Sequence, residues 1–191
     1  MKNPKVIIGV DVGTSKFGVA ALLRGQLDWS WPFVLSSSSQ VRVPPLDDAT
    51  RRIMWVRNRM EMIRHISIST LADNGDQLWA FENPPAARQG GAVKNLHTYS
   101  VLQRAAGVLE VSLLDVGCQV IEFTSSECKI AMTGNGRATK DEVRAAAGLL
   151  FEAELADRGH ALGEDEADAL AAAMAGVAWV RGKLLSGETG A

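Results

Sequence analysis

Two continuous apolar runs, each ending in an acidic residue, limit the folds open to this chain more than any other feature. Val6-Ile7-Ile8-Gly9-Val10 ends at Asp11, and Leu78-Trp79-Ala80-Phe81 ends at Glu82. Short apolar runs of this kind are typical of strands buried on both faces of a sheet. Sites in sheets of this class gather at strand ends. We therefore expect Asp11 and Glu82 to help form a site at one edge of a central sheet.

Three further strands are predicted around these two runs. One covers Phe17 to Leu23, and a tight connection at Arg24-Gly25-Gln26 leads into another from Leu27 to Leu35. Pro32 places this third strand at the sheet edge, because proline cannot donate a ladder hydrogen bond. The last strand is expected from Gln119 to Phe123.

The order of strands and helices predicts an α/β fold with a mixed five-stranded sheet and helices on both faces. Three leading strands suit an antiparallel meander, and later strands that alternate with helices suit parallel crossovers. The chain has 191 residues, enough for one domain with a full core. We expect a single domain over residues 1–185 and a flexible tail over 186–191. The expected helices are 48–70, 94–115, 125–132, one that Thr139 caps with Glu142 in capping-box position, and 164–184.

Composition indicates a globular protein and sets few other limits. Apolar residues make up 47% and charged residues 22% of the chain, which is ordinary for a globular domain. Cys118 and Cys128 form neither a metal spacing nor a disulfide framework, so we expect reduced thiols and a cytoplasmic location. The run from Val6 to Val10 is too short for a membrane span, and no membrane association is expected. A net charge of −2 means that any nucleic-acid binding must depend on local patches.

A second pair of acids stands at a predicted helix start. Asp165 and Asp168 are three residues apart, so both carboxylates lie on one helix face. Small alanines in the apolar stripe behind them allow this helix to lie close to its neighbour. Acids are common in a first helical turn because they favour the helix dipole. The pair becomes informative when Asp11 and Glu82 are added, since four gathered carboxylates could hold divalent metal ions.

Four blocks of this sequence together resemble the RuvC family of Holliday-junction resolvases, within the ribonuclease H-like superfamily. The resemblance covers roughly residues 6–180. The segment between the two lysines discriminates best, because other ribonuclease H-like nucleases generally lack it. The blocks are Ile8-Gly9-Val10-Asp11-Val12-Gly13, Phe81-Glu82, Lys129 to Lys140 with Thr133-Gly134-Asn135-Gly136-Arg137-Ala138 between, and Asp165 to Ala171.

This resemblance implies a ribonuclease H-like fold and a crossover junction endodeoxyribonuclease that resolves four-way junctions by paired symmetric nicks. The products would carry 5′-phosphate and 3′-hydroxyl ends. The implied catalytic metal ligands are Asp11, Glu82, Asp165 and Asp168, and the implied catalytic lysines are Lys129 and Lys140. Two Mg²⁺ or Mn²⁺ ions about 4 Å apart would activate a water molecule and stabilise the leaving oxygen.

The resemblance also suggests where DNA and a second subunit would bind. Arg88, Lys94 and Arg104 lie in a run without acids, and with Arg137 they are candidates to contact DNA phosphates. The loop after Glu82 lacks the aromatic residue that family members can carry there, so Pro85 is the candidate apolar wedge. A two-fold junction suits a C2 homodimer, with the helix from Lys94 to Asp115 in its interface. The sequence names no branch-migration partner, and a bacterial, phage-infected or organellar setting stays open.

Three other functions are compatible with parts of the sequence. Asp11-Val12-Gly13-Thr14-Ser15 resembles the phosphate turn of sugar kinases and actin-like ATPases, but those proteins need two domains and an interdomain cleft. A related nuclease acting on flap or branched DNA or on structured RNA would have the same acids, and the segment from Lys129 to Lys140 favours a resolvase over it. A non-enzymatic nucleic-acid-binding module would have no need to keep all four acids.

Overall fold

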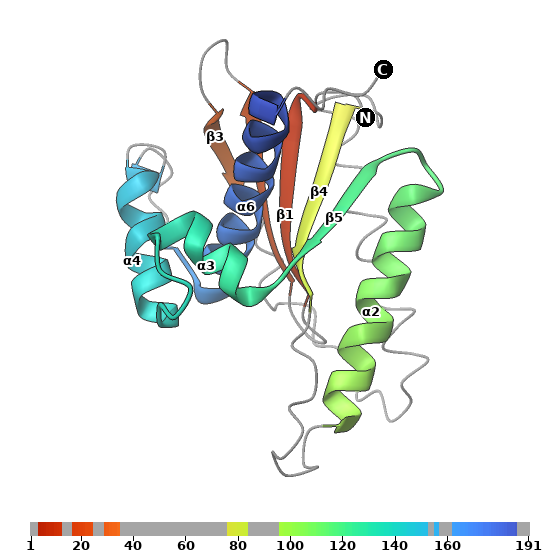
Figure 1. The fold of residues 1–191 in the computed structure, drawn as a ribbon. Helices are drawn as coiled ribbons and strands as arrows, with labels where there is room; N and C mark the ends of the chain where they lie inside the picture. Colours follow the sequence, from red (N-terminus) through yellow and green to blue (C-terminus); the bar gives the residue numbers. More distant parts are fainter. Residues whose placement is uncertain are drawn as a thin grey trace.

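A five-stranded sheet lies at the centre of the computed structural model, in the order β3-β2-β1-β4-β5 (Figure 1). The structure describes residues 4–12, 17–24, 29–34, 76–83, 96–152, 155–156 and 162–186. The strands are β1 Val6–Val12, β2 Phe17–Arg24, β3 Trp29–Val34, β4 Gln77–Glu82 and β5 Gln119–Phe123. The first three pair antiparallel, whereas β4 is parallel to both β1 and β5. The predicted mixed sheet is confirmed, and so is the edge position of the strand that contains Pro32.

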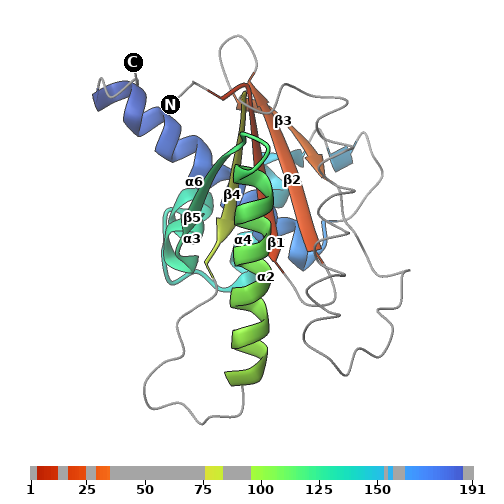
Figure 2. The same cartoon turned by 90° about the vertical axis from the view of Figure 1, so that its right-hand side faces the viewer.

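Helices cover both faces of this sheet, as predicted. Figures 1 and 2 show α2 on one face and α3, α4 and α6 on the other. Their bounds are α2 Leu96–Leu114, α3 Ser125–Thr133, α4 Lys140–Leu150 and α6 Glu164–Ser186. The last residue of α6 is Ser186, which was also predicted as the first residue of the tail. The predicted helix over 48–70 and the remainder of the tail, 187–191, lie outside the described residues.

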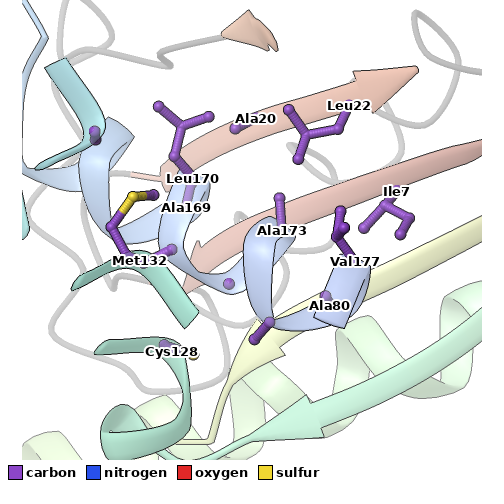
Figure 3. Packing of buried hydrophobic residues seen from close by; sticks show 14 of the residues in the cluster. Ile7, Ala20, Leu22, Ala80, Cys128, Met132, Ala169, Leu170, Ala173 and Val177 are labelled. Carbon is purple, nitrogen blue, oxygen red and sulfur yellow. The ribbon is translucent and has the colours of Figure 1, made fainter. Parts of the chain in front are cut away.

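Side chains of the central strands alternate between two separate cores. Ile7, Leu78 and Ala80 belong to the core under α6, which Figure 3 shows from close by. Their strand neighbours belong to the core under α2, namely Val6, Ile8, Val10, Trp79 and Phe81. Because side chains of a strand point alternately to its two faces, Asp11 and Glu82 follow Ile7 and Leu78 to the α6 side.

Two glycines allow α6 to lie directly on the sheet. A Cβ atom on Gly9 of β1 would be 1.9 Å from the carbonyl oxygen of Ala169 and 2.9 Å from the Cβ of Ala173. A Cβ atom on Gly18 of β2 would be 1.8 Å from the carbonyl oxygen of Asp165. Side chains at either strand position would push the helix away, so glycines below and alanines above bring the start of α6 close to β1.

The first turns of α3 and α4 are fixed by matching capping boxes. The hydroxyl of Thr124 accepts from the backbone N–H of Glu127 at 3.3 Å, and Thr139 accepts from Glu142 in the same way. Each glutamate in turn accepts from the backbone N–H of its threonine at 2.7 Å. The box predicted at Thr139 is therefore confirmed. These caps hold the two lysine-bearing helices in defined orientations.

Within the described residues, α6 is the single helix long and apolar enough to cross a membrane by length and composition. Half of its most apolar window is buried inside the protein. Its buried residues contact β1, β2 and β4, so packing in the core accounts for its apolar composition.

Candidate functional site

A cavity of about 150 Å³ opens where the ends of β1 and β4 meet α3, α4 and α6. Val10 and Phe81 are register partners in the parallel β1–β4 pair, so Asp11 and Glu82 follow at adjacent positions. The cavity is lined by Asp11, Glu82, Ser125, Cys128, Lys129, Lys140, Val143, Asp168 and Ala171. Three acids and two lysines that are far apart in sequence therefore share one small space.

Most of the sequence-predicted catalytic residues lie at this cavity. The structure brings together Asp11, Glu82, Asp168, Lys129 and Lys140. Asp165 does not line the cavity, although its negative charge still acts on Asp11. It lies on the neighbouring part of the first turn of α6, and its carbonyl faces Gly18.

Asp11 is the acid most strongly affected by its surroundings. Its pKa is raised from an ordinary value of 3.8 to about 7, and burial is the largest cause. The charges of Asp168, Asp165 and Glu82 contribute to this rise, and Lys140 acts in the opposite direction. Carboxylates gathered in a partly desolvated space repel one another, so their ionised forms need compensating positive charge.

Ser125 contacts Glu82, and sequence reasoning missed this role. Burial raises the pKa of Glu82, whereas a hydrogen bond from the Ser125 side chain lowers it. No site residue was predicted at the start of this helix. Ser125, Cys128 and Lys129 follow a spacing of i, i+3 and i+4, which places them on one face of α3. Because Lys129 was a predicted catalytic residue, this spacing could have identified Ser125 as a second residue on the same helix face.

Lys140 links the cavity to the start of α6. Its Nζ donates to a carboxylate oxygen of Glu164 and, at 3.2 Å, to Oδ2 of Asp168. The bond to Glu164 is the main cause that raises the pKa of Lys140, so the ammonium form is favoured. Glu166 has a different role, because its buried carboxylate accepts from the backbone N–H of Gly163 at 2.7 Å.

The donor set at the cavity suits hard divalent cations. Carboxylate oxygens are the ligands that Mg²⁺ and Mn²⁺ prefer, and the raised pKa values of Asp11 and Glu82 indicate a shortage of positive charge. Within the described residues, no group of three or more His, Cys, Asp or Glu side chains is already arranged to hold a metal ion. Among the described residues, Lys140 forms an ion pair with Asp168, with 3.2 Å between Nζ and Oδ2.

The predicted DNA-binding residues fall into two groups. Arg104 on α2 and Arg137 in the turn between α3 and α4 are exposed, and neither lines the cavity. Pro85, Arg88 and Lys94 lie outside the described residues. The turn that holds Arg137 is itself ordered by local bonds, since the backbone N–H of Arg137 donates to Asn135 Oδ1 at 3.0 Å.

Comparisons with known proteins agree on one family. The family model described as "Crossover junction endodeoxyribonuclease RuvC" matches residues 90–176, which contain α2, α3, α4 and the start of α6. A relative of that name from Anaeromyxobacter sp. (strain Fw109-5) is 40% identical over 84 residues. That alignment covers 44% of this chain and 38% of the relative, less than half of either protein.

Other matches extend over most of the chain. A relative of the same name from Hydrogenovibrio crunogenus is 26% identical over 174 residues, 91% of this chain and 88% of the relative. The solved structure titled "T. thermophilus RuvC in complex with Holliday junction substrate" has a TM-score of 0.65 at 22% identity. It covers 93% of this chain and 95% of that chain, which establishes a common fold.

Proposed function

We propose that this chain is a member of the RuvC family and a metal-dependent crossover junction endodeoxyribonuclease that resolves four-way DNA junctions. One observation carries the proposal. Asp11, Glu82 and Asp168 meet Lys129 and Lys140 at a single cavity in a chain with this family's fold. A module that only binds DNA has no need for carboxylates that disfavour an anionic backbone at that point.

The acids and lysines have separate roles in this proposal. Asp11, Glu82, Asp165 and Asp168 would hold two divalent cations, either Mg²⁺ or Mn²⁺. When bound, such cations would activate a water molecule and stabilise charge on the leaving oxygen of a phosphodiester. Lys140 and Lys129 offset charge that develops on the scissile phosphate or grip the adjacent backbone. Hydrolysis then leaves 5′-phosphate and 3′-hydroxyl ends.

A two-fold substrate favours a two-fold enzyme. Paired symmetric nicks require two active sites that face opposite strands, which a C2 homodimer provides. Exposed apolar side chains on α2 support this helix as part of the interface, since Val111 is 57% and Leu114 51% exposed. Arg104 and Arg137 are exposed, and in this proposal they contact the phosphates of DNA arms. We place this activity in the cytoplasm of a bacterial or phage-infected cell.

Cleavage of a synthetic immobile four-way junction in Mg²⁺ tests the proposal. Linear duplex, flap and RNA hairpin substrates of matched sequence are the controls, and light scattering of the free protein tests the dimer. We expect paired nicks at symmetric positions of the junction and no cutting of the duplex. Preferential cutting of the flap or the RNA would instead make the chain a nuclease for another substrate, with the same four acids.

A further inference from the structure

The ammonium group of Lys140 is shared between two carboxylates on α6 that differ in their exposure. The side chain of Glu164 is 55% exposed and does not line the cavity, whereas that of Asp168 is 19% exposed and does. Lys140 itself is 62% exposed. An isolated surface ion pair would contribute little. This pair differs because one of the two partners of Lys140 is an acid that lines the cavity.

The backbones at both ends of this link are held in place. Lys140 is the first residue of α4 and directly follows the Thr139 cap, which the reciprocal bonds with Glu142 fix. Glu164 is the first residue of α6, and the bond from Gly163 N–H to the buried Glu166 carboxylate fixes that turn. The two contacts of the ammonium, with Glu164 and with Asp168, therefore join helix starts whose backbones are fixed by local hydrogen bonds.

We propose that Glu164 is a positioning residue that holds Lys140 at the cavity rim and thereby leaves Asp168 free to bind a divalent cation. This inference rests on the proposed function. Lys140 and a metal ion compete for the same carboxylate, because both are cations that contact Asp168. With Glu164 present, the ammonium keeps a carboxylate partner when the metal ion takes Asp168. Without Glu164, Lys140 depends more heavily on Asp168, and the metal ion must displace it.

Mn²⁺ binding to the full chain without DNA, measured by isothermal titration calorimetry, tests this directly. We expect Glu164→Gln to weaken Mn²⁺ binding by about tenfold, the lower end of the range for residues that orient metal ligands. Lys140→Ala should bind Mn²⁺ at least as tightly as wild type, because the competitor is gone. The decisive comparison is the double variant, in which Glu164→Gln should have little further effect.

Two more variants separate positioning from a general effect of charge or folding. Asp141→Asn removes an exposed ion pair with Arg144 on the first turn of α4 and should leave Mn²⁺ binding unchanged. Glu164→Asp keeps the carboxylate on a shorter stem and should restore part of the lost affinity. In cleavage assays Glu164→Gln should raise the Mn²⁺ concentration needed for half-maximal rate while the junction KM stays unchanged. Thermal unfolding of each variant checks that the fold is retained.

Several outcomes would overturn the inference. Equal weakening by Glu164→Gln with and without Lys140 would mean that Glu164 acts on the metal ion through its own charge. If Glu164→Gln binds Mn²⁺ as tightly as the wild type, and the wild type cuts junctions, the inference about Glu164 is wrong and the proposed function stands. If the wild type binds Mn²⁺ through Asp168 but cuts no junction, the proposed substrate is wrong. The comparison of Glu164→Gln with and without Lys140 would still test the inference. If the wild type binds no Mn²⁺, both the inference and the proposed metal-dependent function are wrong.

Discussion

Gly18 lies against the backbone of Asp165, so close that a Cβ on Gly18 would come within 1.8 Å of the Asp165 carbonyl oxygen. Gly18 is also the register partner of Asp11 in the antiparallel β1–β2 pair. The residue that faces Asp11 across the ladder is thus the residue on which the first turn of α6 rests. Because Gly18 has no side chain, Asp165 of α6 can lie close to Asp11 of β1, although the two acids are far apart in sequence.

Gly18→Ala should therefore cost both stability and cleavage. The added methyl group collides with backbone, which cannot move aside as a flexible side chain could, and we expect a loss of about 1–3 kcal/mol in unfolding free energy. Gly182→Ala is the matched control, because nothing lies within 4 Å of a Cβ there and alanine favours a helix. Urea denaturation and junction cleavage measure the two effects. A Gly18→Ala protein with wild-type stability and rate would show that α6 does not depend on this contact.

Glu82→Gln and Asp165→Asn should each abolish cleavage and leave junction binding intact. Both substitutions keep the size of the side chain but remove a charge proposed to hold a metal ion. Cleavage in Mg²⁺ and a gel-shift assay measure the two properties separately, and EDTA should stop the wild type in the same way. Asp141→Asn, an exposed acid on α4, is the control. Cleavage by either site variant at a near wild-type rate would refute the assignment of that acid.

Without metal, the protein should lose stability as pH rises from about 4 to about 7. The pKa of Asp11 is about 7 in the folded protein and 3.8 when unperturbed, so between these values the folded state holds a proton that the unfolded state has released. Ionisation of Asp11 above pH 7 then disfavours the folded state by about 2–4 kcal/mol.

Urea unfolding in EDTA at pH 5 and pH 8 tests this pH dependence. Asp11→Asn carries no charge at either pH and should show a smaller decline than the wild type. Mg²⁺ should reduce the decline of the wild type at pH 8 by compensating the carboxylates. An identical decline in wild type and Asp11→Asn would locate the pH dependence elsewhere.

Lys140→Ala should slow cleavage more than it weakens junction binding. Its ammonium lies beside the cavity acids, where it can act on charge that develops at the scissile phosphate. Single-turnover rates and gel-shift affinities give the two losses. Arg144→Ala removes another exposed cation of α4 that does not line the cavity, and it should leave the rate unchanged. Equal losses of rate and affinity in Lys140→Ala would reduce Lys140 to a phosphate clamp.

Ser125→Ala should raise the pKa of Glu82 further, because it removes the hydrogen bond that favours the carboxylate. We expect the acidic limb of the cleavage pH–rate profile to move to higher pH and the rate at neutral pH to fall about threefold to tenfold. Ser126→Ala changes the exposed neighbour in the same turn and serves as the control. An unchanged profile in Ser125→Ala would show that this hydroxyl does not act on Glu82 in the working enzyme.

Local patterns predicted the sheet better than they predicted the cavity. The predicted bounds of β5 and the Thr139 cap are confirmed, because a short strand and a capping box each depend on a few neighbouring residues. Helical spacing placed Asp165 and Asp168 on one face, but such residues differ by about 60° around the axis. Which of the two lines the cavity depends on how α6 lies over Gly9 and Gly18. The contacts of Ser125 and Glu164 likewise depend on packing between distant helices.

The alternation of β1 and β4 makes the site depend on the number of residues as well as on their identity. Asp11 and Glu82 face α6 because they share strand parity with Ile7 and Leu78. Inserting or deleting one residue within either strand would turn the acid toward the other core, among Trp79 and Phe81. Length changes during the evolution of this chain are therefore expected in its connections and excluded from these two strands. A scan of single-residue insertions should show the same boundary, with function lost abruptly inside each strand.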